Sequence, residues 1–460
     1  MTPAPFTSAL TAPLFGDAEA AEILSDQAFI AHMITVEAAL ARACAAVGLV
    51  RPADAEALCV TLAQARISPE QLGTGMASAG VPVPALVAEL RKNCGAEGQA
   101  LHWGATSQDI VDCAHVLQWC ALADLLAGRL SALLDAMAAL SAAQADTVMA
   151  GRTRSQIATP ITLGLRIATW AQPLITLEAE LPDLKTRLMR VQFGGSSGSG
   201  SAVGEKAGVL SMALAQELGL APAPCWHLDR SGPQALGAWL VRLSASLGKL
   251  ARDLSLAGRS EIGEIRAGTG GGSSTMPQKS NPVSAEAVIS LAQYTTALQP
   301  LLAQAAMAQE ERDGAAWALE WLALPQMGVA ASAGLRHAHA LITSLQADLA
   351  RMAAHLDAGQ GAVMAEAASF ALARHMPRAE AGRVVKQALE AARNTGTSLA
   401  QVLREDDKFG ALEDWTRCLA PESAQPAAEA MRARIWALRD GPDARDRRAA
   451  ISRQKPESGD

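Results

Sequence analysis

The strongest constraint on the fold is a series of long segments that are rich in Ala and Leu and contain few Gly or Pro residues. Ala and Leu are strong helix formers, and helices of this length are roughly two to three times the average for soluble proteins. Aromatic residues make up only 3% of the chain, whereas sheet proteins favour aromatic and β-branched residues. The sequence therefore predicts an all-α protein. The long helices are predicted at roughly 110–146, 157–192, 232–266, 283–312 and 325–357.

Three regions that differ in helix length, in helix breaks and in charge predict three domains. Residues 1–110 form an N-terminal helical domain with frequent breaks, in which a helix from Asp26 ends at Gly48. Residues 111–357 form a central long-helix bundle, and residues 358–460 form a C-terminal domain of shorter, more charged helices with a disordered tail. Long apolar bundles often bury their faces against copies of the same chain, so we expect an oligomer, with a monomeric bundle as the alternative.

Charge and cysteine usage limit the function classes. The chain has 39 Lys plus Arg against 46 Asp plus Glu, which argues against a nucleic-acid partner bound through phosphate neutralisation. We expect no membrane partner, because no uninterrupted apolar run approaches the ~18–20 residues of a membrane helix. The N-terminus lacks the basic and apolar regions of a signal peptide. Seven cysteines without a C-x-x-C pair favour reduced thiols in the cytoplasm over a zinc site or a disulfide framework.

Two loops rich in Gly and Ser interrupt the central region, at 194–204 and 268–282. The second presents serine hydroxyls and the ammonium group of Lys279 on a glycine-rich backbone that can open and close. Such a loop suits a lid that closes on an anionic substrate. By composition alone, however, both loops are better explained as flexible connectors between helices.

The order of residues in the second loop favours the lid. The segment GSSTMPQKSNP (272–282) resembles the signature of the fumarase/aspartase superfamily, G-S-S-x-M-P-x-K-x-N-P. The resemblance extends over about residues 10–440. Within the superfamily, the sequence is most similar to the branch that cyclises 3-carboxy-cis,cis-muconate. Further segments that carry the resemblance are LHWGATSQDIVDCA (101–114), GRTRSQIATPITLG (151–164), PCWHLDR (224–230) and ERDGAAWALEW (311–321).

The resemblance implies a three-domain, all-α homotetramer with a twenty-helix core. Each active site would be assembled from three subunits and would need neither a metal nor an organic cofactor. The chemistry implied is β-elimination or its reverse, here the addition of a substrate carboxylate to a conjugated double bond to give 4-carboxymuconolactone in protocatechuate degradation. The substrate is a small tricarboxylate, and the intermediate carries extra negative charge, so the site needs positioned donors and cations.

The resemblance also assigns catalytic roles within and beside the signature. Ser273 matches the catalytic base and acid of the superfamily, and a serine in that role needs amide dipoles, a cation and exclusion of water. Lys279 would hold the carboxylate that becomes the enolate, and Asn281 would orient it. Glu286 stands where relatives keep a glutamate that pairs with a catalytic histidine.

The substrate-binding residues come from three other segments. His102, Thr106 and Ser107 match the H-x-G-A-T-S segment and can donate to carboxylate oxygens. Gln156 matches the glutamine of the G-R-T segment. Arg312 matches the arginine of the E-R segment, where a planar guanidinium can bind a carboxylate with two hydrogen bonds.

The sequence departs from the family pattern in three ways. Arg154 stands where fumarases and adenylosuccinate lyases place a catalytic histidine, so it is expected to pair with Glu286 or to bind a substrate carboxylate. Ile157 replaces a histidine that is usual in the cycloisomerase branch, and the signature reads Q-K-S in place of H-K-R. The alternatives are adenylosuccinate lyase, another dicarboxylate lyase of the superfamily, and a non-catalytic helical structural protein.

Overall fold

The computed structural model of the chain describes residues 5–268, 270–272, 276 and 279–441. The all-α prediction is confirmed, because helices form most of this part of the chain and its strands are short. Backbone contacts divide the chain into two compact units. The first unit comprises 1–130, 180–248 and 287–336, and the second comprises 131–179, 249–286 and 337–460. The division into three sequential domains stays a prediction.

Seven helices among the described residues lie wholly in the first unit, and five long helices contribute to both units. The seven are α1 (Ala12–Phe15), α2 (Ala18–Ile23), α3 (Asp26–Ala46), α4 (Pro52–Ala63), α5 (Pro69–Ala79), α6 (Val83–Arg91) and α9 (Ala207–Leu218). The five are α7 (Ser107–Ala143), α8 (Leu163–Leu188), α10 (Ser231–Ala257), α11 (Val283–Ala305) and α12 (Gly314–Thr343).

The second unit holds the remaining α-helices and the longest strands. Its α-helices are α13 (Leu349–Asp357), α14 (Ala365–Leu372), α15 (Arg378–Thr395), α16 (Leu399–Glu405), α17 (Trp415–Cys418) and α18 (Gln425–Asp440). Its strands are β1 (Val148–Thr153), β2 (Gln156–Thr162), β3 (Ile265–Arg266), β4 (Gly271–Gly272), β5 (Ser280–Asn281) and β6 (Gln346–Ala347), which pair antiparallel as β1–β2, β3–β6 and β4–β5. Short 3-10 turns lie at Ala96–Ala100, Gly195–Ser197, Gly204–Lys206, Ala362–Met364 and Pro421–Ala424.

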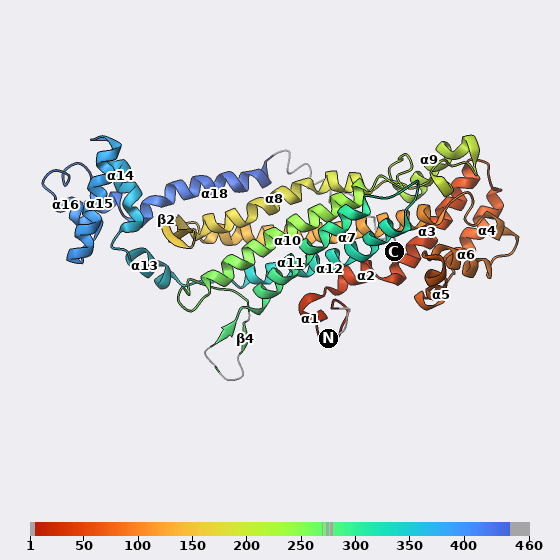
Figure 1. Cartoon of the computed structure of the whole chain (residues 1–460), viewed down its shortest axis with the longest axis horizontal. Helices are drawn as coiled ribbons and strands as arrows, with labels where there is room; N and C mark the ends of the chain where they lie inside the picture. The colour runs from red at the N-terminus through yellow and green to blue at the C-terminus, as the bar shows by residue number, and fades with distance from the viewer. Residues whose placement is uncertain (1–4, 269, 273–275, 277–278, 442–460) are drawn as a thin grey trace. The chain divides into compact units, whose positions relative to one another are not determined.

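The helices that open the first unit follow the sequence prediction closely. The Ser25 side chain accepts a hydrogen bond from the amide of Ala28 and caps α3. The helix ends before Gly48, whose φ of 72° is the left-handed conformation that glycine tolerates. Helix α3 packs against α4 and α9, and these helices lie together in Figure 1. The apolar stretches of α3 and α7 would be long enough to cross a membrane, but half or more of each is buried inside the chain, which is typical of core helices in a soluble protein.

Close helix contacts in the first unit depend on glycine. A Cβ added to Gly237 on α10 would lie 2.1 Å from Leu302 on α11, and one added to Gly328 on α12 would lie 2.7 Å from Leu122 on α7. Both separations are shorter than atoms tolerate, so a side chain at either position would force the facing leucine to move. The small-residue composition of the long helices therefore serves packing as well as helix formation.

Two of the predicted long helices are wrong at their boundaries in the second unit. Residues 156–162 form strand β2 of a hairpin, and α8 begins only at Leu163. Thr153 and Gln156 face each other across a two-residue turn, and the β-branched residues that follow favour a strand. The helix predicted at 325–357 instead runs from Gly314 to Thr343, and a second helix, α13, starts after Asp348, whose side chain caps it.

The other long helices match the prediction at their starts and end earlier. Helix α10 stops at Ala257, where the amide of Glu264 donates to the Ala257 carbonyl and the chain turns toward β3. Helix α11 stops at Ala305, and α7 stops at Ala143. The cause is local hydrogen bonding that helix periodicity does not report.

A buried ion cluster fixes the start of α10 in the first unit. The Arg230 guanidinium donates to both carboxylate oxygens of Asp112, at 2.8 and 3.1 Å, and to both of Glu320, at 2.9 and 2.5 Å. The indole Nε1 of Trp317 donates to Asp112 at 3.0 Å. Arg230 is 3% exposed and the two carboxylates 0% and 2%, so removing Arg230 would leave two buried carboxylates without the cation that neutralises them.

We therefore expect Arg230→Met to lower the free energy of unfolding by about 3–5 kcal/mol. The matched control is Arg242→Met, which breaks the exposed pair between Arg242 on α10 and Glu180 on α8 and should cost about 0–1 kcal/mol. Urea denaturation followed by circular dichroism measures both variants. Equal losses in the two variants would show that the buried cluster contributes no more than a surface pair.

Candidate active site

The first set of predicted residues gathers at the N-terminus of α7 in the first unit. Ser107 is the first residue of this helix, and Thr106 precedes it. The Arg312 guanidinium donates from Nη1 to the Thr106 hydroxyl at 2.5 Å and to the Ser196 carbonyl at 3.3 Å. The structure thus brings together Thr106, Ser107 and Arg312, with a cation held beside a helix N-terminus, where backbone amides favour anions.

His102 lies in the loop before α7 and is tied to α3. Its backbone amide donates to Glu37 Oε2 at 3.0 Å, and its Nδ1 lies 2.7 Å from Glu37 Oε1. Burial lowers the pKa of His102, but the hydrogen bond to Glu37 and the charge of that carboxylate raise the pKa by more than burial lowers it. The net shift of the pKa is therefore upward. Because the pair uses Nδ1, the ring is oriented and Nε2 is the nitrogen that a ligand can meet.

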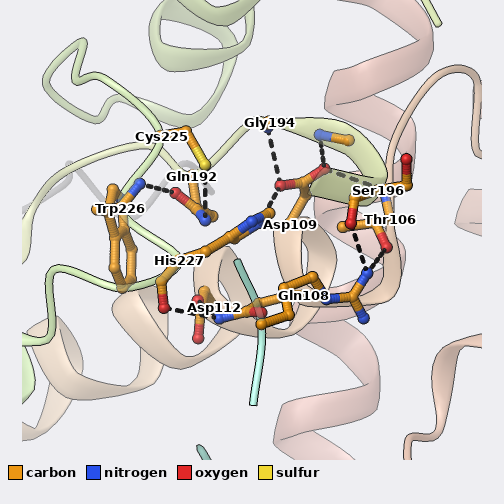
Figure 2. A network of polar contacts seen from close by, with 12 residues as sticks. Thr106, Gln108, Asp109, Asp112, Gln192, Gly194, Ser196, Cys225, Trp226 and His227 are labelled. Atoms are coloured by element: carbon orange, nitrogen blue, oxygen red, sulfur yellow. Dashed lines mark hydrogen bonds and ion pairs between the residues drawn. The ribbon is translucent and has the colours of Figure 1, made fainter. Parts of the chain in front are cut away.

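A buried carboxylate that received no role from the sequence organises this region. The Asp109 side chain, 1% exposed, accepts from the amides of Thr106 at 2.9 Å, Gly194 at 3.0 Å and Gly195 at 2.9 Å. It also contacts His227 Nε2 at 2.9 Å. Figure 2 shows these contacts converging on one side chain from three separate segments. Asp109 stands in the motif H-x-G-A-T-S-x-D, so its position was visible in the sequence although its partners were not.

The 194–204 loop is a structured part of this region, and its interpretation as a flexible connector is wrong. Gly194 and Gly195 donate their amides to Asp109, and Gly195 has a φ of 66° that favours glycine. The turn presents the Ser196 carbonyl to Arg312. The loop therefore helps to position the cation that the sequence assigned to substrate binding.

The second set of predicted residues lies at the base of the signature loop in the second unit. Asn281 on β5 pairs with Gly271 on β4, and exposed Lys279 precedes β5. Gly270 has a φ of 66°, and a Cβ there would lie 2.0 Å from the Ser280 hydroxyl. The positive φ therefore favours glycine at this position, directly before β4. Ser273 lies outside the described residues.

An open pocket of about 1100 Å³ surrounds the base of this loop. Lys279 and Asn281 line it, and Glu286 lies one helical turn into α11, exposed to solvent. The pocket also contains three guanidinium groups and two carboxylates, so its charge favours anions. These charged lining residues are Arg259, Arg266, Arg351, Glu261 and Asp348.

Arg154 and Gln156 lie at the tip of the β1–β2 hairpin in the second unit. Arg154 and Ser155 form the two-residue turn, with φ values of 49° and 65°, which is the geometry of a type I′ hairpin. Non-glycine residues are strained in this conformation. Arg154, Gln156 and Ile157 are all exposed, Ile157 at 45%, so the hairpin presents the segment in which the chain departs from its relatives.

The predicted residues thus form two sets, one in each unit. The first unit holds His102, Thr106, Ser107 and Arg312, and the second holds Arg154, Gln156, Lys279, Asn281 and Glu286. The sequence missed Asp109, His227 and the 194–200 turn, which support the first set.

Comparison with known proteins gives the family. A lyase family model matches residues 12–294. The chain is 38% identical to 3-carboxy-cis,cis-muconate cycloisomerase of Pseudomonas aeruginosa, over 85% of this chain and 86% of the relative. It is 35% identical to the enzyme of the same name from Bradyrhizobium diazoefficiens, over 92% of this chain and 96% of the relative.

The fold agrees with a solved structure. The crystal structure of 3-carboxy-cis,cis-muconate lactonizing enzyme from Pseudomonas putida superposes with a TM-score of 0.87 at 34% identity, over 94% of this chain and 99% of that one. The helical fumarase/aspartase fold is therefore confirmed, and the chain belongs to the lyase family of the fumarase/aspartase superfamily.

Proposed function

We propose that the protein is a cytoplasmic cycloisomerase that converts 3-carboxy-cis,cis-muconate to 4-carboxymuconolactone without a metal or organic cofactor. The observation that carries this proposal is the Arg312 guanidinium, held by Thr106 and Ser196 at the amide-rich start of α7. A cation and oriented amides together suit a carboxylate. The similarity to relatives named for this reaction, over most of both chains, supports the choice of substrate.

The reaction joins an oxygen of one substrate carboxylate to the carbon β to another carboxylate. A proton must be added to the carbon α to that second carboxylate, and negative charge develops there as the C–O bond forms. In our proposal Lys279 stabilises the developing charge, Asn281 orients the carboxylate, and Ser273 transfers the proton. Hydrogen-bond donors that are already in position stabilise the developing charge most, because they need not reorganise as the charge forms.

The remaining predicted residues hold the other carboxylates. Arg312, Thr106 and Ser107 supply donors at the N-terminus of α7, and His102 can donate from Nε2 when its ring is charged. Arg154 and Gln156 are exposed at the hairpin tip, where Arg154 would bind a carboxylate or neutralise Glu286. A guanidinium stays protonated at neutral pH, so Arg154 acts as a binding group and not as a proton carrier.

The direct test is to mix the purified protein with 3-carboxy-cis,cis-muconate and follow loss of the conjugated-diene absorbance. We expect turnover, with 4-carboxymuconolactone as the product identified by mass spectrometry and proton NMR. Fumarate, adenylosuccinate and argininosuccinate serve as comparison substrates. Turnover of one of these and not of the muconate would assign the chain to another lyase of the superfamily, and turnover of none would favour a structural role.

Ser273→Ala should lower kcat by about 10²–10⁴-fold, because the variant lacks the proton-transfer group. The neighbouring serine supplies a matched control, since Ser274→Ala removes the same hydroxyl from the next position of the same loop. Steady-state kinetics on both variants decide the assignment. Ser273→Ala with activity within threefold of the unchanged protein would exclude Ser273 as the essential proton carrier.

The proposed assembly is a homotetramer whose active sites combine residues of different subunits. Ser273→Ala and Arg312→Ala would then each be inactive alone and partly active together, because a mixed tetramer contains some sites with both native residues. The two variants, with different affinity tags, are co-expressed and purified through both tags in succession. Activity in the doubly tagged fraction supports shared sites, and a doubly tagged fraction without activity contradicts them.

A further inference from the structure

A second group of reactive side chains lies beside the 194–200 turn and uses none of the predicted lyase residues. The half-buried thiol of Cys225 lies so close to this turn that a Cβ added to Gly194 would lie 2.3 Å from its sulfur, and one added to Gly198 would lie 3.4 Å from it. The Gln192 amide donates from Nε2 to the Cys225 sulfur at 3.7 Å. The Trp226 amide donates to Gln192 Oε1 at 2.8 Å and fixes the amide in this orientation.

His227 provides a proton acceptor for this thiol. Its Nε2 lies 2.9 Å from Asp109 Oδ1, and an ionised carboxylate can only accept, so Nε2 carries a hydrogen and Nδ1 is the atom that gains or loses a proton. Among the described residues, this buried Nδ1 has no hydrogen bond of normal geometry. A Cβ at Gly198 would lie 4.0 Å from Nδ1 and 3.4 Å from the Cys225 sulfur, so both atoms face the same point of the turn.

The charges of the group agree with this geometry. Burial lowers the pKa of His227, but its contacts with Asp109 and Cys225 raise it more, to about 9. The ring is therefore charged at neutral pH, and both of its nitrogens then carry a hydrogen. Desolvation raises the pKa of each of the other six thiols, and four of these are half-buried like Cys225, namely Cys59, Cys94, Cys120 and Cys418.

We propose that Cys225, His227 and Asp109 form a reactive-thiol site whose reactant is a peroxide. Cys225 gives up its proton to Nδ1 of the neutral His227 ring, so that a thiolate and a charged ring form a pair, and the thiolate attacks one oxygen of hydrogen peroxide. The S–O bond forms as the O–O bond breaks, and the departing hydroxide takes the proton from Nδ1 and leaves as water. Sulfur is oxidised by two electrons to the sulfenic acid, and the peroxide is reduced.

The site is placed so that modification affects the neighbouring turn. The Cys225 sulfur lies so close to Gly194 that an oxygen atom added on that side of the sulfur would displace the turn. Gly194 and Gly195 hold Asp109, and the next residue, Ser196, accepts from Arg312. Oxidation of Cys225 should therefore loosen the contact that holds the Arg312 guanidinium.

The test measures alkylation of each cysteine in the full-length reduced protein. Limiting iodoacetamide is added between pH 5.5 and pH 9, and peptide mass spectrometry gives a rate for each site. An ordinary thiol has a pKa of about 8.5 and loses reactivity about tenfold per pH unit below it. At pH 6.5 we expect Cys225 to react at least about tenfold faster than Cys59, Cys94 and Cys418, with little decline toward lower pH. Hydrogen peroxide followed by the sulfenic-acid reagent dimedone should label the same residue first.

Two histidine variants distinguish an effect of His227 on Cys225 from a general loosening of the fold. His227→Gln should bring the alkylation rate of Cys225 down to that of the other half-buried cysteines. His355→Gln breaks a similar pair, His355 Nδ1 with Glu264 at 2.7 Å in the second unit, and should leave the rate unchanged. If His227→Gln does not fold, the pH profile of the unchanged protein decides. The proposal would be overturned if Cys225 were alkylated within threefold of the rates of Cys59, Cys94 and Cys418, and if its rate rose with pH as theirs do.

Discussion

The first unit depends on one buried carboxylate, that of Asp109. Burying a carboxylate is costly unless hydrogen bonds replace water, and here three backbone amides and one imidazole do so. Bonds to an ionised acceptor are stronger than neutral ones. Asp109 also sits three residues after Thr106 and accepts its amide, as in a capping box, so the same group starts α7 and anchors the 194–195 turn.

A second group of charged residues, next to Asp109 on α7, supports the same region. Asp112 lies three residues further along α7, on the same face of the helix, and binds Arg230, which also binds Glu320 on α12. The Gln108 side chain donates to Asp112 and to the carbonyl of His227, both at 3.3 Å. Thus the two aspartates position both the segment that carries His227 and the start of α10. The candidate substrate-binding group, Arg312 with Thr106, rests on this framework and not on the apolar core alone.

The sequence predicted the helical class, the long helices and the signature segments, because these depend on local composition and spacing. It did not predict the role of Asp109, because three of the four partners of this carboxylate, Gly194, Gly195 and His227, lie 85 to 118 residues away in the chain. Cys225 and His227 were visible within PCWHLDR only as a point of resemblance. The hairpin at 148–162 was missed because its second strand continues directly into an apolar helix, so that no break in composition separates them.

The most direct test of this account is hydrogen–deuterium exchange on Asp109→Asn. The substitution keeps the size of the side chain but replaces one acceptor oxygen with a donor, so the amides of Thr106, Gly194 and Gly195 cannot all remain bonded. We predict faster exchange in peptides that contain these three amides and unchanged exchange in α15, which lies in the other unit. Unchanged protection at Gly194 and Gly195 would contradict the claim that Asp109 holds the turn in place.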